Sequence, residues 1–322
     1  MGQRAFRTFW FEATALQGSV TPQVMPHVLA FGAWAFAVCV VHHVAELLFP
    51  VRIAMEIGPH EIGGAILALL LILRTNAGYD RWWEARKLWG GIVNQSRNFV
   101  ITALSYGPTD LEWRRRLVRW TSTFPHVARA SLRGERPCCK VEALLGPEAA
   151  AQLAAVDHMP SFVAGVLAAS LRESRDQNGM DHFAFLQADR ERALLIDHIG
   201  ACERILKTPL PMVYAINIRR FMLLFLLTLP FALLHKLGND WLVPLVTMLV
   251  AYPLMSLDQI GIELQNPFAT NNLSHLPLDV ICTTIERNLG AILSASDGSA
   301  IGIGDAPLVG RDGSVAALAA AD

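Results

Sequence analysis

Four long apolar segments restrict the fold of this chain more than any other feature of its sequence. They cover residues 28–50, 62–73, 221–234 and 241–257. Charged residues make up only 17% of the 322 positions, below the roughly 25% of an ordinary soluble domain. A helix needs about 20 apolar residues to cross a bilayer, whereas runs of about 10 to 14 also occur in soluble cores. Hydropathy alone therefore fits two to four membrane spans and also a soluble helical bundle.

The basic residues beside these segments predict the orientation of the spans. One set of flanks carries most of them: Arg4, Arg7, Arg81, Arg86, Lys87, Arg219 and Arg220. The two short connections on the other side carry only Arg52 and Lys236. Because lysine and arginine concentrate on the cytosolic side of a membrane, we expect two helical hairpins with both chain termini in the cytosol.

We predict membrane helices at about residues 28–49, 62–105, 217–235 and 239–258. The polar residues 107–216 and 259–290 are predicted to form a cytosolic helical region, since no strand-like alternation of useful length occurs there. Its helices are expected at residues 111–130, 140–156, 161–172 and 182–206. Residues 291–322 are rich in Gly, Ala, Ser and Asp, a composition typical of a disordered tail. Residues 1–290 would then form one domain.

The second apolar segment is the most informative part of the chain. It turns abruptly polar after residue 73, and no proline interrupts residues 60–107. On a helix, Ala65, Leu69 and Leu73 share one face because they recur every four residues. Around a symmetry axis such a face would form rings of apolar side chains, a constriction that can gate by dewetting. The same spacing also describes ordinary packing between helices.

The polar residues that follow this face read RTNAGYDRWWEARKLWG, at positions 74–90. Further along come GACERI and TPLP (200–211), LPF (229–231), ELQNPF (263–268), LPL (276–278) and CTTIERNL (282–289). In this order the segments resemble the bacterial members of the bestrophin family. The resemblance covers about residues 3–290.

The resemblance implies an all-α membrane protein with four membrane helices per subunit, assembled as a homopentamer around one axial pore. Such a channel would pass small monovalent ions, chloride or sodium and potassium, passively across the bacterial inner membrane. By position, the pore neck would be Ala65, Leu69 and Leu73. Family members usually carry bulky side chains there, so Ala65 predicts a wider outer ring. A cytosolic aperture would fall near Phe183, counted back from Cys202.

Two charged features near the predicted neck have competing interpretations. Arg74 follows the neck directly and could attract anions at the inner mouth of the pore. It could equally form a structural ion pair with Asp80, Glu84 or Glu286, which we favour. Animal bestrophins bind calcium with an acidic run after the Asn-Pro-Phe motif, but residues 269–272 read ATNN here. Since calcium prefers several carboxylate and carbonyl oxygens, we do not expect calcium activation at this place.

Two other classes of function stay open from the sequence. His42 and His43 lie in the first span, where ionisable residues often have a role, and could ligate haem or a metal. A non-conducting membrane scaffold could bind partners through the polar middle region. Catalytic signatures such as GxSxG, HExxH or a P-loop do not occur, and the net charge of -1 shows no nucleic-acid footprint. We expect no enzyme activity, catalytic residue, cofactor or bound metal, and as partners only further copies of the chain, small inorganic ions and the lipid bilayer.

Overall fold

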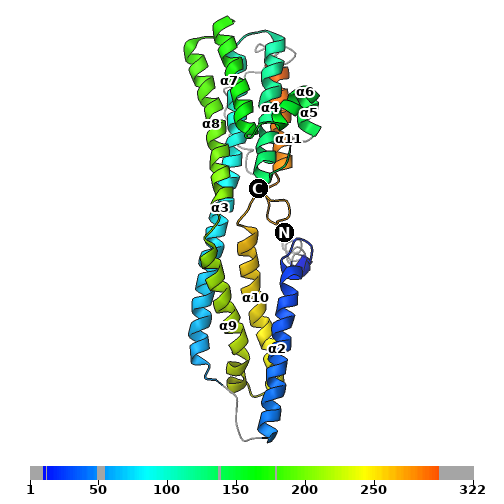
Figure 1. The fold of residues 1–322 in the computed structure, drawn as a ribbon, viewed down its shortest axis with the longest axis vertical. Coiled ribbons are helices and arrows are strands. Elements are labelled where there is room, and N and C mark those ends of the chain that lie inside the picture. Colours follow the sequence, from blue (N-terminus) through cyan, green and yellow to red (C-terminus); the bar gives the residue numbers. More distant parts are fainter. Residues whose placement is uncertain (1–9, 12, 49–54, 137–138, 178–179, 297–322) are drawn as a thin grey trace, which may run out of the picture. The chain divides into compact units, whose positions relative to one another are not determined.

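The structure is a computed structural model that describes residues 10–11, 13–48, 55–136, 139–177 and 180–296. Predictions that involve Arg4, Arg7, Arg52 or residues 297–322 lie outside these ranges. The helices are α2 (Thr21–Leu48), α3 (Gly58–Tyr106), α4 (Leu111–Arg133), α5 (Cys139–Leu145), α6 (Pro147–Ala154), α7 (Met159–Gln177), α8 (His182–Lys207), α9 (Met212–Lys236), the 3₁₀ helix η1 (Asp240–Leu242), α10 (Val243–Glu263) and α11 (Leu278–Ser296). The described ranges contain no β-strand, which confirms the all-α prediction (Figure 1).

Within the part of the chain that the structure describes, four helices are long and apolar enough to cross a membrane: Thr21–Leu48, Gly58–Tyr106, Met212–Lys236 and Asp240–Glu263. Most of them extend past the bounds expected from hydropathy. The first begins at Thr21 rather than near residue 28, and the last ends at Glu263 rather than near residue 258. Hydropathy detects only the apolar part of a span, whereas the helix continues through the polar residues at its ends.

The chain divides into two compact units. The first comprises residues 1–92, 129–136 and 197–278, and the second comprises residues 93–128, 137–196 and 279–322. The first unit holds α2, α9, α10 and the N-terminal part of α3. The second unit holds the C-terminal part of α3 together with α5, α6, α7, α11 and most of α4 and α8.

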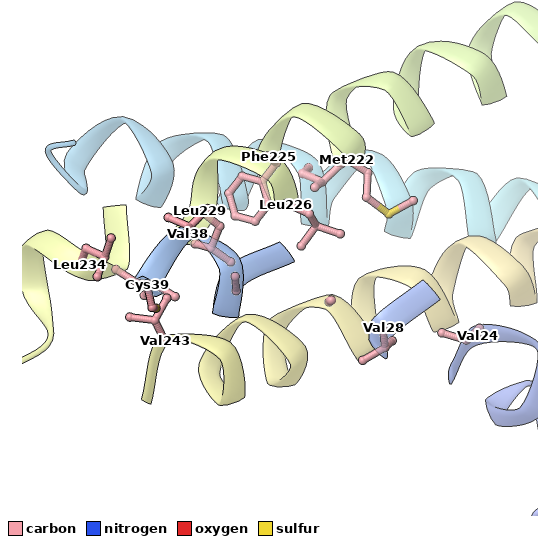
Figure 2. Packing of buried hydrophobic residues seen from close by; sticks show 14 of the residues in the cluster. Val24, Val28, Val38, Cys39, Met222, Phe225, Leu226, Leu229, Leu234 and Val243 are labelled. Carbon is pink, nitrogen blue, oxygen red and sulfur yellow. The ribbon is translucent and has the colours of Figure 1, made fainter. Parts of the chain in front are cut away.

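The core of the first unit lies between α2, α3, α9 and α10 and is built from apolar side chains of all four helices, part of which Figure 2 shows. Val28 and Val38 come from α2, and Leu226 and Leu229 from α9. α2 also approaches α10 closely at Gly32, where an added Cβ would lie 2.6 Å from the sulfur of Met248. Small residues allow such close approach between membrane helices.

A buried arginine organises the second unit. Arg114 donates hydrogen bonds to the backbone oxygens of Pro108 (2.8 Å) and Leu104 (3.1 Å) at the end of α3. It also donates to the backbone oxygen of Ser296, the last residue of α11, at 3.3 Å. The final carbonyls of a helix lack partners within the helix, so one side chain satisfies the ends of two helices.

Two predictions for the polar region are wrong in detail. The helix expected at residues 140–156 is two helices, because Gly146 has a φ of +86° and Pro147 starts α6. Proline suits the first position of a helix, where its missing N–H costs nothing. The predicted tail boundary at residue 290 is also too early, since α11 continues to Ser296.

Candidate functional site: an uncovered apolar face and the ion pairs behind it

One apolar face of α3 is not covered by the rest of the described residues. Leu69 and Leu73 are 57% and 51% exposed, and Ala65 is exposed beside them. On the other side of the helix, Leu67 and Leu71 are fully buried. The three residues predicted to form the neck therefore share an uncovered face and do not belong to the core of the first unit.

The buried face of α3 packs on α9, and this contact sets the rotation of α3 about its axis. An added Cβ at Gly64 would lie 3.3 Å from the ring of Phe225, so the two helices meet closely there. Nε2 of His60 lies 2.9 Å from the hydroxyl of Thr228. With this side held against α9, Leu69 and Leu73 face away from the core.

Arg74 follows Leu73 in sequence but lies on the buried face. Its side chain is 2% exposed and forms an ion pair with Asp258 of α10. The other carboxylate oxygen of Asp258 accepts a hydrogen bond from Nε of Arg219 on α9, at 2.9 Å. A single carboxylate thus joins two arginines and connects α3, α9 and α10.

The partner of Arg74 is therefore Asp258, and none of the residues considered from the sequence. The candidates named from the sequence were Asp80, Glu84 and Glu286. The position of Asp258 in the sequence could have indicated this pairing. It is the first ionisable residue after the apolar run 241–257, and charged side chains at membrane depth are generally paired.

Arg81, the second arginine of the polar segment 74–90, caps the end of a helix. Its guanidinium donates to the backbone oxygens of Ile205 and Thr208 at the end of α8. A further bond reaches the backbone oxygen of Gln265, at 3.4 Å. At the next position, Nε1 of Trp82 donates to the backbone oxygen of Ser274 at 2.7 Å. Arg81 and Trp82 thus attach α3 to the end of α8 and to the segment that follows α10.

α3 and α8 also meet closely at Gly91. An added Cβ there would lie 2.5 Å from the imidazole of His198. Burial lowers the pKa of His198, although Asp197 beside it favours the charged form.

Burial, reinforced by Glu203 and Glu84, raises the pKa of the Cys202 thiol to about 12. Since the thiolate is the reactive form, Cys202 is an inert core residue.

Phe183 lies in the first turn of α8, in the second unit. Its side chain is 79% exposed. Asp181 caps this turn, because its carboxylate accepts hydrogen bonds from the backbone N–H groups of Phe183 (2.9 Å) and Ala184 (3.1 Å). The ring therefore lies on a capped helix start and is not covered by other described residues.

His42 and His43 have different surroundings. His42 is buried, with Nε2 3.6 Å from Glu46 and 3.9 Å from Asp240. His43 is exposed, and its ring lies 6.4 Å from that of Trp241. Within the described ranges, no cluster of three or more His, Cys, Asp or Glu side chains could hold a metal ion.

The sequence and the fold both match one family of proteins. The family model of bacterial and fungal bestrophin proteins matches residues 2–291. This chain belongs to the bestrophin family. The four apolar helices of this bestrophin accordingly identify it as a membrane protein.

Named relatives match most of the chain. A protein of Nostoc sp. named as a voltage-dependent anion channel-forming protein is 32% identical over 292 residues, which is 89% of this chain and 92% of the relative. The Escherichia coli protein YneE, which has the same description, is 31% identical over 237 residues, or 74% and 77% of the two chains. The crystal structure of a bestrophin homologue from Klebsiella pneumoniae superposes with a TM-score of 0.77 at 26% identity, over 84% of this chain and 98% of that one.

Proposed function

We propose that this bestrophin assembles as a homopentamer and forms a channel through which small monovalent anions cross the membrane passively. The observation that carries the proposal is the uncovered face of α3, where Leu69 and Leu73 stay half exposed although they are apolar. Around a symmetry axis this face would be covered by its own copies. The names of the relatives, which describe anion channel formation, support the same function.

The proposed neck consists of rings of Leu69 and Leu73, with Ala65 forming a wider ring outside them. Water leaves a narrow apolar constriction readily, and an ion must then shed part of its hydration to pass. The barrier would depend on side-chain size at these positions. Because Arg74 pairs with Asp258 behind the neck, it would position α3 and not attract ions itself.

The neck provides no fixed charge, so ion sign must be decided by charged residues elsewhere along the axis. Chloride is the ion that we propose, and sodium or potassium is the alternative. The names of the relatives favour the anion. Phe183, exposed on the rigid start of α8, is the proposed cytosolic aperture. The flanking basic residues favour cytosolic termini, and the bacterial inner membrane is the proposed location.

The test is current through the purified full-length protein in a planar bilayer under a NaCl gradient. A reversal potential near the chloride equilibrium value is expected, and a value near that of sodium would overturn the anion assignment. Leu69→Ala combined with Leu73→Ala should raise the conductance. Leu249→Ala serves as the matched control, because this leucine of α10 is also apolar and exposed (72%) but lies outside the proposed neck.

Assembly has to be measured in the same preparation. Native mass spectrometry would give the number of subunits directly. If a verified pentamer carried no current in the wild type or in the double neck variant, the channel proposal would fail. If Leu249→Ala raised the conductance as much as the neck variant, the neck assignment alone would fail.

A further inference from the structure

A cavity of about 450 Å³ opens between α2, α9 and α10 in the first unit. It lies apart from the α3 face that the proposed pore would use. Its apolar wall includes Phe31, Met222 and Leu226. Figure 2 shows three of the lining residues, Met222 and Leu226 on α9 and Val24 on α2. The cavity has the size and wall chemistry to accept part of a hydrocarbon chain.

The polar residues of the cavity gather at one end of the helices. Gln23 and His27 lie near the start of α2, Arg219 lies near the start of α9, and Asp258 and Gln259 lie near the end of α10. These three helix ends belong to the same side of the membrane spans, whereas Phe31 and Leu226 lie further along their helices. The cavity therefore runs from polar to apolar with depth, as a lipid does from headgroup to acyl chain.

The charges at the polar end favour an anion. Asp258 faces the cavity, but it is paired with both Arg74 and Arg219. This trio of two guanidinium groups and one carboxylate carries one net positive charge, and the buried Glu263, which accepts a hydrogen bond from Gln259, does not line the cavity. The Arg219 side chain is 48% exposed and contacts Asp258 through Nε, so its terminal amino groups can donate to a ligand. Arginine binds phosphate well because its planar fork matches the oxygens.

We propose that this cavity binds an anionic phospholipid, with the phosphate on Arg219 and an acyl chain along Phe31 and Leu226. Basic pockets between membrane helices are suited to acidic headgroups. The buried trio of Arg74, Asp258 and Arg219 would then link the lipid to α3, since Arg74 extends from that helix. Under the proposed orientation the lipid belongs to the cytosolic leaflet. The binding itself does not depend on ion conduction.

Lipid binding can be measured on the assembled full-length protein after delipidation. We would titrate phosphatidylglycerol and phosphatidylcholine separately and count the bound lipids by native mass spectrometry. Phosphatidylglycerol should bind about tenfold more tightly, which corresponds to about 1.4 kcal/mol. Equal affinity for the two lipids would overturn the proposal, and this comparison on the wild type needs no variant.

Arg219→Gln should reduce the affinity for phosphatidylglycerol to nearly that for phosphatidylcholine, while Asp258 keeps Arg74 as its partner. Arg220→Gln is the matched control, because it removes the same charge from the next position, which is exposed and does not line the cavity. Equal losses in both variants would mean general surface attraction and would overturn the assigned site. Inorganic phosphate alone serves as the competitor that distinguishes a site for free anions from a lipid site. Full displacement of the bound phosphatidylglycerol by phosphate would contradict the role of the apolar wall.

Discussion

Arg74 on α3 and Asp258 on α10 form a buried ion pair between positions 184 residues apart in the sequence. Arg74 directly follows Leu73, the last residue of the proposed neck. The pair therefore fixes the α3 helix at the point where its exposed face changes from apolar to polar. A buried charge without its partner is strongly destabilising, so the pair also restricts which rotations of α3 the fold tolerates.

Asp258→Asn should destabilise the protein by about 3 to 5 kcal/mol, because it leaves Arg74 buried without a negative partner. Thermal unfolding of the purified protein in detergent, followed by circular dichroism, measures the effect. Asp80→Asn is the control, since Asp80 is exposed on the same helix as Arg74 and surface changes usually stay within about 0.5 kcal/mol. Equal unfolding temperatures for the two variants would show that the pair has no structural role.

Ala65→Leu should lower the single-channel conductance, because a ring of leucines narrows the outer part of the proposed neck and lengthens its dry segment. The measurement is single-channel recording in planar bilayers at fixed salt. Ala37→Leu adds the same volume at an exposed position of α2 and should leave the conductance unchanged. An unaltered conductance in Ala65→Leu would place residue 65 outside the ion path.

Gly91→Ala should destabilise the contact between α3 and α8 by about 1 to 3 kcal/mol, the usual cost of overpacking. The new Cβ would lie 2.5 Å from the His198 ring. Gly165→Ala is the matched comparison, because Gly165 lies inside α7 and an added Cβ there meets nothing within 4 Å. That variant should be stabilised by up to about 1 kcal/mol from helix propensity. Unfolding temperatures that shift in the same direction would contradict the close approach at Gly91.

Stability should fall as the pH is lowered through the region below about 6.5, the ordinary pKa of histidine. Burial lowers the pKa of His198 in the folded protein, so the unfolded chain binds the extra proton first and stability decreases towards acid pH. The His198 contribution is fully present above the unfolded pKa and is lost as the pH falls through the folded one. Unfolding temperatures measured from pH 8 to pH 5 should follow this trend.

His198→Gln should make this pH dependence shallower. His182→Gln, in the exposed first turn of the same helix, should leave the pH dependence of stability unchanged. If both variants kept the slope of the wild type, the pH dependence would have to come from other groups.

Much of the architecture follows directly from the sequence. Long uncharged runs are poorly solvated as loops, so four apolar helical segments are predictable from composition, whereas their length alone fits two to four membrane spans. The helical period places Ala65, Leu69 and Leu73 on one face without any knowledge of the fold. The break at Gly146 and Pro147 was also readable, since a proline in that position starts a helix.

Tertiary structure decided what each face of those helices contacts. Spacing alone could not tell whether Leu69 and Leu73 were packed or uncovered, because both arrangements have the same period. Nor could it join Arg74 to Asp258, or Gly91 to His198, because these contacts form between helices that are distant in the chain. Helical periodicity is a local property of the backbone, whereas burial and pairing of charges depend on which helices meet.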